Sequence, residues 1–401
     1  MASPHAWIAA RLGLSLRATT GLFFVVCVAS IWVAASFVVQ DIQAAGAKPA
    51  VLTYIANSLF ALYLPLYYFK AWLSGRAGRL AAGLPQDEEE RGRLVATRAA
   101  PERVLLDGPP GIEGGAQQRH ALLVVEEAAP AQITAWQTFN ASVVVAPMWY
   151  LAQFTFNASL LSTSVTSNTL ISSTSVLFTY LLSVALLSER YTLRKLGCIA
   201  LLILGTAGVA LADELASPDA AAARGSLLGD ALCLLSALLY GTYTVAIRRM
   251  LGEDETTSVL LFFGYMGSII FVCGAALGLV ALLAGAGLGT LTWPVFWAIV
   301  AKGLLDNVLS DYLWARAILL IGPTLATAGL SLQIPLAVTA DALFRSPAWL
   351  RAFWPLVLTA AGGLTILVGF LAMTLVPARL PAQELPVAEM TRDPSPKAPA
   401  R

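Results

Sequence analysis

The sequence predicts an all-α integral membrane protein with ten transmembrane helices, arranged as two inverted five-helix repeats. Three observations support this fold class. Hydrophobic residues make up 58% of the chain and charged residues only 12%, whereas a soluble domain is about one quarter charged. Apolar runs of about 18 residues or more, long enough to cross a bilayer core, recur about ten times. The distribution of lysine and arginine between the loops and the spacing of the apolar runs both fit two halves of five spans each.

The apolar runs define the expected spans in order. The first run follows Arg11 and Arg17, and it is longer than the apolar core of a signal peptide, about 7–15 residues, so it is expected to be retained. The ten spans are expected at 18–39, 51–72, 134–156, 164–187, 193–212, 227–250, 258–283, 294–316, 322–344 and 354–376.

The spans divide the chain into five parts. Residues 1–17 are expected to form a cytosolic N-terminal tail, and 18–213 the first five-span repeat. A loop at 73–133 interrupts this repeat, and its mixed charge, glycine and proline indicate a flexible cytosolic segment. A non-cytosolic linker is expected at 214–226, followed by the second five-span repeat at 227–376 and a disordered cytosolic tail at 377–401.

Lysine and arginine set the orientation. With the N-terminus in the cytosol, twenty of the 25 basic residues fall on the cytosolic side and Lys302 lies inside a span. Such an excess is what the positive-inside rule expects. The four on the opposite side are Lys48, Arg224, Arg345 and Arg351.

The inverted repeat follows from spacing. Spans one and two precede spans six and seven by about 210 residues, and spans three to five precede spans eight to ten by about 160 residues. The difference matches the extra length of the 73–133 loop over its counterpart near 284–293. Because each half has an odd number of spans, the second half must enter the membrane from the opposite side.

The eighth span carries charges. Lys302 and Asp306 are one helical turn apart, which favours an intrahelical ion pair. At about 100° per residue, Asp311 points nearly opposite to Lys302, on the face of Asn307. Arg316 is expected at the cytosolic headgroups. Intramembrane charges face the bundle interior or a wet cavity. Three readings remain open: a pair that joins helices, a solute site with Lys302 holding an anion and Asp311 pairing or titrating, or a misplaced span boundary.

Polar side chains also concentrate in spans four and nine. The fourth span includes Asn168, Ser172, Ser173 and Thr174, whose groups could bind a solute or bond back to the helix and let neighbouring helices approach closely. In the corresponding span of the second half, Gln333 and then a proline interrupt the apolar pattern. A proline frees a backbone carbonyl, and such breaks often lie near transporter sites.

Other functional classes lack support. A net charge of +1 and the absence of basic patches with interleaved aromatic residues argue against a nucleic-acid partner. The sequence has no HExxH, no CxxC, no phosphate-binding loop and no plausible Ser/His/Asp or Cys/His set, so we expect neither an enzyme nor a bound metal or cofactor. The expected partners are the lipid bilayer and a small-molecule solute. The spacing of Gly274 and Gly278 suits a helix dimer, so a homodimer is possible, although packing within the chain explains it better.

Long stretches of the chain resemble the drug/metabolite transporter superfamily, whose repeat is called EamA, and most closely solute carrier family 35, subfamily F. The resemblance covers nearly all the spans in order. It rests above all on "LTYIANSLFALYLPLYYFK" at 52–70, "APMWYLAQFTFNASLLSTSVTSNTLISSTSVLFTYLLS" at 146–183 and "GLLDNVLSDYLWARAILLIGPTLATAGLSLQIPLAVTAD" at 303–341.

The resemblance implies a solute transporter of an internal membrane, vacuolar or Golgi, with both termini cytosolic. It also implies a central cavity lined by spans three, four, eight and nine. Lys302 is less general in the family than the residues after it, and the lysine motifs of nucleotide-sugar carriers are absent, so no nucleotide sugar is expected. Carried over by position, the residues near the solute would be Asn168, Ser172, Ser173, Thr174, Asn307, Asp311 and Gln333, beside Lys302 and Asp306 from the charge pattern.

Two functions remain open. The first is a secondary transporter that moves a small polar organic solute by alternating access of the two repeats. The second is a non-transporting membrane sensor or scaffold that acts through the 73–133 loop and the C-terminal tail. A passive pore is a third and weaker alternative.

Overall fold

The computed structural model describes most of the helical part of the chain. The described residues are 15–82, 133–160, 165–216, 227–252, 258–285, 287, 289, 291–344 and 347–375. Most of the expected N-terminal tail, the greater part of the 73–133 loop, most of the linker and all of the C-terminal tail lie outside these residues. Apart from one isolated bridge between Ala47 and Gly289, the regular structure within them is helical.

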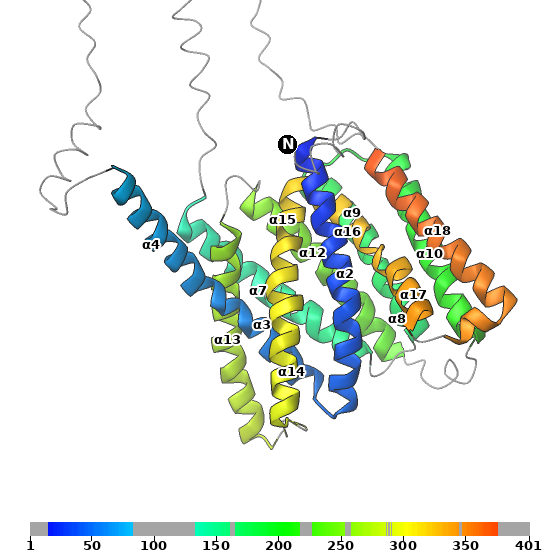
Figure 1. Ribbon diagram of the computed structural model, residues 1–401, viewed down its shortest axis with the longest axis horizontal. Helices are drawn as coiled ribbons and strands as arrows, with labels where there is room; N and C mark the ends of the chain where they lie inside the picture. The colour runs from blue at the N-terminus through cyan, green and yellow to red at the C-terminus, as the bar shows by residue number, and fades with distance from the viewer. Residues whose placement is uncertain are drawn as a thin grey trace, which may run out of the picture.

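The helices of the two halves follow in chain order (Figure 1). The first half consists of α2 (Leu16–Ala44), α3 (Pro49–Ser58), the 3-10 turn η1 (Leu59–Leu62), α4 (Tyr63–Ala82), α7 (Ala135–Ser159), α8 (Val165–Ser173), α9 (Ser175–Leu186) and α10 (Leu193–Ala216). The second half consists of α12 (Leu227–Leu251), α13 (Val259–Leu283), α14 (Trp293–Gly303), the π-helical segment η2 (Leu304–Ser310), α15 (Asp311–Ile321), α16 (Pro323–Leu330), α17 (Gln333–Phe344), the 3-10 turn η3 (Ala348–Arg351) and α18 (Phe353–Leu375).

The helices confirm the all-α membrane class. Among the described residues, eight helical segments are long and apolar enough to cross a membrane. The expected spans 134–156 and 294–316 are helical but are not among the eight, so the count of ten stays a prediction. The helix α4 continues to Ala82, so the first ten residues of the expected 73–133 loop are helical, while the segment apolar enough to span a membrane ends at Gly75.

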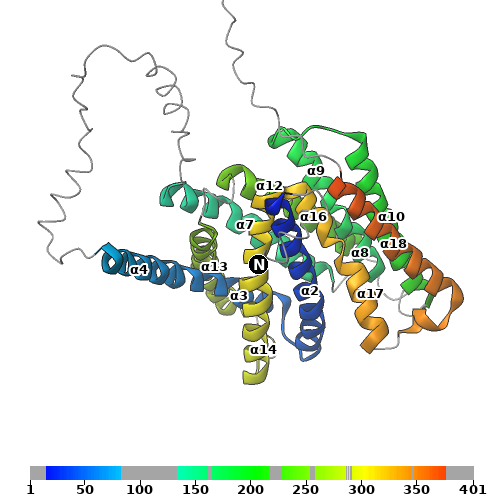
Figure 2. The same cartoon turned by 45° about the horizontal axis from the view of Figure 1, so that its top comes forward.

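The two halves make reciprocal contacts. α7 packs on α12, and α15 packs on α2, so the third segment of each half contacts the first segment of the other. In the same way α9 contacts α12 while α16 contacts α2, and α13 contacts α7 while α14 contacts α3. Figure 1 shows α2 beside the α14–α15 rod, and both views place α10 beside α18 (Figure 2). Each contact therefore has a counterpart when the halves are exchanged.

Two spans are broken near their middle, one in each half. The break between α8 and α9 falls at Thr174, and that between α16 and α17 at Ser331 and Leu332. The second break directly precedes Gln333 and Pro335, where the sequence predicted an interruption. Pro335 has no backbone N–H and cannot donate to the carbonyl of Ser331, so the break follows from local chemistry.

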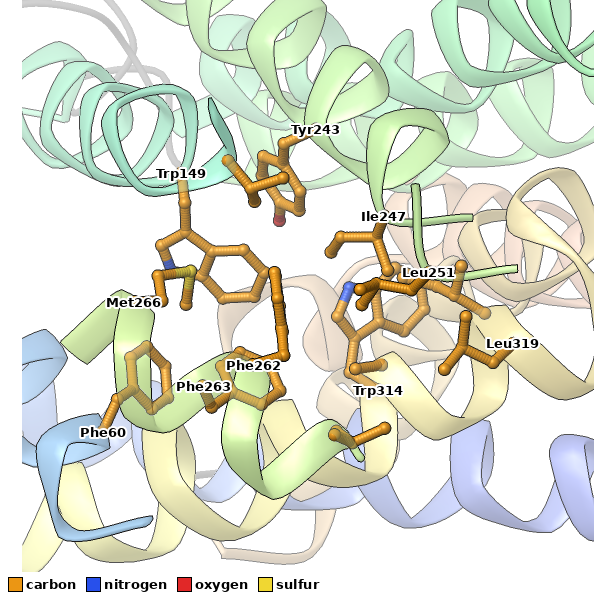
Figure 3. Packing of buried hydrophobic residues seen from close by; sticks show 14 of the residues in the cluster. Phe60, Trp149, Tyr243, Ile247, Leu251, Phe262, Phe263, Met266, Trp314 and Leu319 are labelled. Carbon is orange, nitrogen blue, oxygen red and sulfur yellow. The ribbon is translucent and has the colours of Figure 1, made fainter. Parts of the chain in front are cut away.

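The main core is aromatic and joins the two halves at one end of the bundle. Phe60, Trp149 and Trp314 are fully buried, and Figure 3 shows them packed with residues of α12 and α13. The Trp149 and Tyr243 ring centroids are 4.5 Å apart, and those of Phe60 and Phe263 are 4.9 Å apart. These side chains come from η1, α7, α12, α13 and α15, so the cluster holds together helices of both halves.

Candidate functional site

A cavity of about 720 Å³ lies between the two halves. This volume is within the 300–1,000 Å³ that is usual for small-molecule sites. Its lining comes from α2, α3, α7, α8 and α9 of the first half and from α12, α14, η2, α15, α16 and α17 of the second. Eight of the nine predicted site residues line it, and these are Asn168, Ser172, Ser173, Lys302, Asp306, Asn307, Asp311 and Gln333.

Thr174 is the predicted residue that does not line the cavity. It forms the break between α8 and α9, and its hydroxyl donates to the carbonyl of Ile171 at 2.6 Å. The structure therefore places Thr174 as part of the helix break rather than on the cavity wall. Its neighbours Ser172 and Ser173 both line the cavity.

The cavity lies toward one end of the bundle. In the first half its lining uses the C-terminal halves of α2 and α7, most of α3, and residues on both sides of the α8–α9 break. In this half it therefore lies toward the end where α2 connects to α3. Toward the other end, the lining residue Tyr243 packs against Trp149, and the lining residue Tyr240 packs against Trp314. The aromatic core shown in Figure 3 thus lies behind one wall of the cavity.

The charged residues lie in and beside the π-helical segment η2. Its wider turns leave backbone carbonyls without regular helical partners, and side chains supply replacements. The Tyr63 hydroxyl donates to the carbonyl of Val308, and the Ser310 hydroxyl donates to the carbonyl of Asp306. The Trp32 indole N–H in turn donates to Ser310 Oγ at 2.6 Å. Helices of the first half therefore support the π-helical geometry in the second.

This geometry corrects one expectation about the charges. With 100° per residue, Asp311 was predicted to point away from Lys302. Both line the same cavity, because a π-helical stretch between them holds more residues per turn than an α-helix. Gly303 precedes this stretch, and a Cβ there would lie 2.6 Å from Leu59 Cδ1 and 3.3 Å from Ala56 Cα, so α14 approaches η1 and α3 closely at this point.

The predicted ion pair is confirmed. Lys302 Nζ lies 2.5 Å from Asp306 Oδ2, and the two side chains are only 11% and 15% exposed. Lys302 also donates to Asn307 Oδ1 at 3.3 Å. With two partners close by, the ammonium group is largely satisfied within the protein. The structure thus supports the alternative in which Lys302 pairs with Asp306.

Asp311 differs from Asp306 in its surroundings. It is only 2% exposed, and the Asn307 side chain hydrogen-bonds to it. Tyr63, Tyr240 and Tyr243 lie close enough to interact with it electrostatically. Among the described residues, the ion pairs join other side chains and none includes Asp311. Its direct neighbours are a neutral amide and aromatic side chains, and the paired Asp306 and Lys302 also act on it electrostatically, with opposite signs.

Some polar residues of α8 bond back to their own helix, which was one of the two alternatives for them. The hydroxyls of Ser172 and Ser173 donate back to the carbonyls of Thr169 and Leu170, at 3.2 and 2.7 Å. The amide group of Asn168 donates to Ser159 Oγ at 2.8 Å, so α8 is tied to the end of α7. Their protons are used within the protein, while their oxygen lone pairs remain on the cavity side.

Several lining residues were not predicted from the sequence. Asn57 is 2% exposed and accepts from the Trp149 indole N–H at 3.0 Å, while its own amide group donates to the Thr53 carbonyl. Asn157 donates to Thr53 Oγ1 at 3.0 Å. A lone amide within an apolar span was the available signal, since such groups seek internal partners in lipid. Trp32 and Tyr240 carry no such signal, because aromatic residues are common on helices that face either lipid or core.

The sequence also matches known proteins. The family model described as SLC35F, solute carrier family 35, matches residues 141–298. The thiamine-repressible mitochondrial transport protein THI74 of Saccharomyces cerevisiae is 26% identical over 84% of this chain and 87% of its own length. Solute carrier family 35 member F5 of Bos taurus is 30% identical over 61% of this chain and 45% of its own length. The chain is a membrane transporter that is similar to the SLC35F proteins.

Two further matches bear on location and fold. A vacuolar membrane protein of Saccharomyces cerevisiae is 27% identical over 82% of this chain and 84% of its own length. A solved crystal structure aligns with a TM-score of 0.53 over 90% of this chain and 98% of that chain, at 15% identity. The second match supports the fold alone.

Proposed function

We propose that the chain is a secondary transporter that moves a small polar organic solute across an internal membrane by alternating access of two inverted repeats. The cavity between the halves is the observation that carries this proposal. It lies toward one end of the bundle, and both halves contribute polar and charged side chains to it. The reciprocal contacts of the halves support an exchange of their roles, because a two-fold related pair of repeats can rock about a shared site.

The substrate-binding residues in this proposal are those that line the cavity. Asp311, Asn307 and Gln333 face the solute, with Asn168, Ser172 and Ser173 across the cavity. Lys302 and Asp306 shape the site through their ion pair. The broken spans α8–α9 and α16–α17 allow rearrangement, since a helix interrupted near its middle can bend without losing many hydrogen bonds.

The membrane and orientation belong to the same proposal. An internal membrane, vacuolar or Golgi, is supported by the vacuolar relative, although another relative is named as mitochondrial. Cytosolic termini are supported by the excess of basic residues on that side. In this orientation the cavity lies toward the non-cytosolic end.

Labelling of single cysteines tests the proposal without knowledge of the solute. Ser36 is exposed and lines the cavity, whereas Ile247 is fully buried in the aromatic core. Each is replaced by cysteine in a background without the chain's own cysteines. We expect Ser36→Cys to react with a membrane-impermeant maleimide from one side only, and Ile247→Cys to react slowly from the other side, in a state whose core has opened.

Two results would overturn alternating access. Simultaneous reaction of Ser36→Cys from both sides indicates a pore. Complete protection of Ile247→Cys, with one-sided reaction at Ser36→Cys, indicates a bundle that does not exchange states. That second result is expected of a sensor or scaffold. Removal of residues 83–132 should leave both labelling patterns intact in a transporter.

A further inference from the structure

The charges of the cavity are unbalanced. Three charged side chains line it among the described residues: Lys302, Asp306 and Asp311. Lys302 and Asp306 neutralise each other at 2.5 Å, so the remaining charge belongs to the carboxyl group of Asp311. A buried carboxylate without a cation of its own is costly in a low-dielectric site. A positively charged ligand would supply the missing partner.

The hydrogen-bonding groups of the wall point to the same kind of ligand. Asn157 donates both of its amide N–H groups to protein oxygens, and Asn57 and Asn168 each donate one. The hydroxyls of Ser172 and Ser236 donate to backbone carbonyls at 3.2 and 2.8 Å. What these side chains leave for a ligand is mainly oxygen lone pairs. This part of the wall chiefly accepts hydrogen bonds, and its natural complement is a ligand rich in N–H donors.

Aromatic rings complete the surroundings of Asp311. Trp32, Tyr240 and Tyr243 line the same cavity, and both tyrosines interact electrostatically with Asp311. Trp32 is held by its hydrogen bond to Ser310, the residue directly before Asp311. The faces of aromatic rings attract ammonium groups, and most strongly when water is excluded. A carboxylate beside aromatic rings is therefore suited to an organic ammonium ion.

We propose that the cavity binds an organic cation of the amine or ammonium type, with Asp311 as its counter-charge and the rings of Trp32, Tyr240 and Tyr243 around its charged end. This inference rests on the proposed transport function and narrows the class of solute. The carboxylate and rings fix the charged end of the ligand. The rest of the cavity, with Gln333 as an additional hydrogen-bonding group, accommodates its remaining atoms. Lys302 does not bind an anionic solute in this arrangement, because Asp306 already neutralises it.

Three probes of similar size and different charge test the inference. Tryptamine carries an ammonium group, tryptophol a hydroxyl and indole-3-acetate a carboxylate, all on the same indole ring. The unfolding temperature of the purified full chain is measured against the concentration of each. A ligand that binds only the native state raises this temperature as its concentration passes its Kd. We expect tryptamine to stabilise the protein most. Equal or greater stabilisation by the alcohol or the acid, or none by tryptamine up to its solubility limit, overturns the proposal.

Asp311→Asn provides the second arm, with Asp213→Asn as the matched control. Both changes replace a carboxylate in a helix by an amide, but Asp213 does not line the cavity. We expect Asp311→Asn to weaken tryptamine binding by about tenfold or more, as for the loss of a close charge pair, and to remove the preference over tryptophol. Asp213→Asn should bind tryptamine as the wild type does.

The remaining outcomes separate this inference from the proposed function. Unchanged tryptamine affinity in Asp311→Asn would refute the role of Asp311. Suppose that the protein prefers the acid, while Ser36→Cys still reacts from one side and Ile247→Cys from the other. This result would refute the cation and leave transport in place. If Asp311→Asn does not yield folded protein, the comparison of the three probes on the wild type still decides the charge preference.

Discussion

Removal of Lys302 should destabilise the protein through its partner. Lys302 Nζ is 2.5 Å from Asp306 Oδ2, and the Asp306 side chain is only 15% exposed. Loss of one member of a buried ion pair leaves an uncompensated charge, at a cost of about 3–5 kcal/mol. Because the cavity admits some water to the pair, we expect the lower end for Lys302→Met, a loss of about 3 kcal/mol in the free energy of unfolding.

The double variant separates the pair from the packing. Lys302→Met with Asp306→Leu removes both charges and keeps similar volumes, so it should lie within about 1 kcal/mol of the wild type. Denaturant unfolding of the purified protein in micelles measures the stability of the wild type, the two single variants and the double variant. Lys48→Met is the control, because Lys48 is exposed and donates to the Gly287 carbonyl, and it should change stability by less than about 0.5 kcal/mol. Destabilisation of the double variant by the sum of the single changes would refute the ion-pair account.

Three further changes test the packing around the site. Gly362→Ala places a Cβ 2.6 Å from the Gly205 carbonyl oxygen, so α10 and α18 must separate, and thermal unfolding should show a loss of about 1–3 kcal/mol. Gly322→Ala puts a side chain at φ +83°, between α15 and α16, and the same measurement should show a loss of about 1–2 kcal/mol. Trp149→Phe leaves the buried Asn57 oxygen without its donor, which should cost about 1–3 kcal/mol and be recovered in part by Asn57→Leu. Stability equal to the wild type in any of the three would contradict the corresponding contact.

Local sequence features were enough to predict several parts of the site. The Lys302–Asp306 pair follows from spacing along one helix, and the break before Gln333 follows from Pro335. The gathering of residues from spans four, eight and nine around one cavity required the resemblance to a known family in addition. The pair and the break are set by residues close in sequence, and the gathering of spans by the family resemblance. None of these predictions needed details of side-chain packing.

The π-helical segment could not be predicted in this way. Its carbonyl at Val308 accepts from Tyr63, and Trp32 binds Ser310, so its geometry depends on partners more than two hundred residues away. A helical wheel assumes a constant angle per residue, and it therefore placed Asp311 on the wrong face. Asn57 was missed for a similar reason, since the Trp149 donor that explains its burial lies on another helix.

Counterflow in proteoliposomes tests the central claim most directly. Vesicles with the purified chain are loaded with unlabelled tryptamine, and uptake of labelled tryptamine is followed from outside. A carrier whose single cavity opens to alternate sides should show saturable uptake that internal tryptamine accelerates, and Asp311→Asn should abolish it. Uptake no greater than in empty vesicles, or uptake that rises linearly with concentration and ignores the internal tryptamine, would contradict the account.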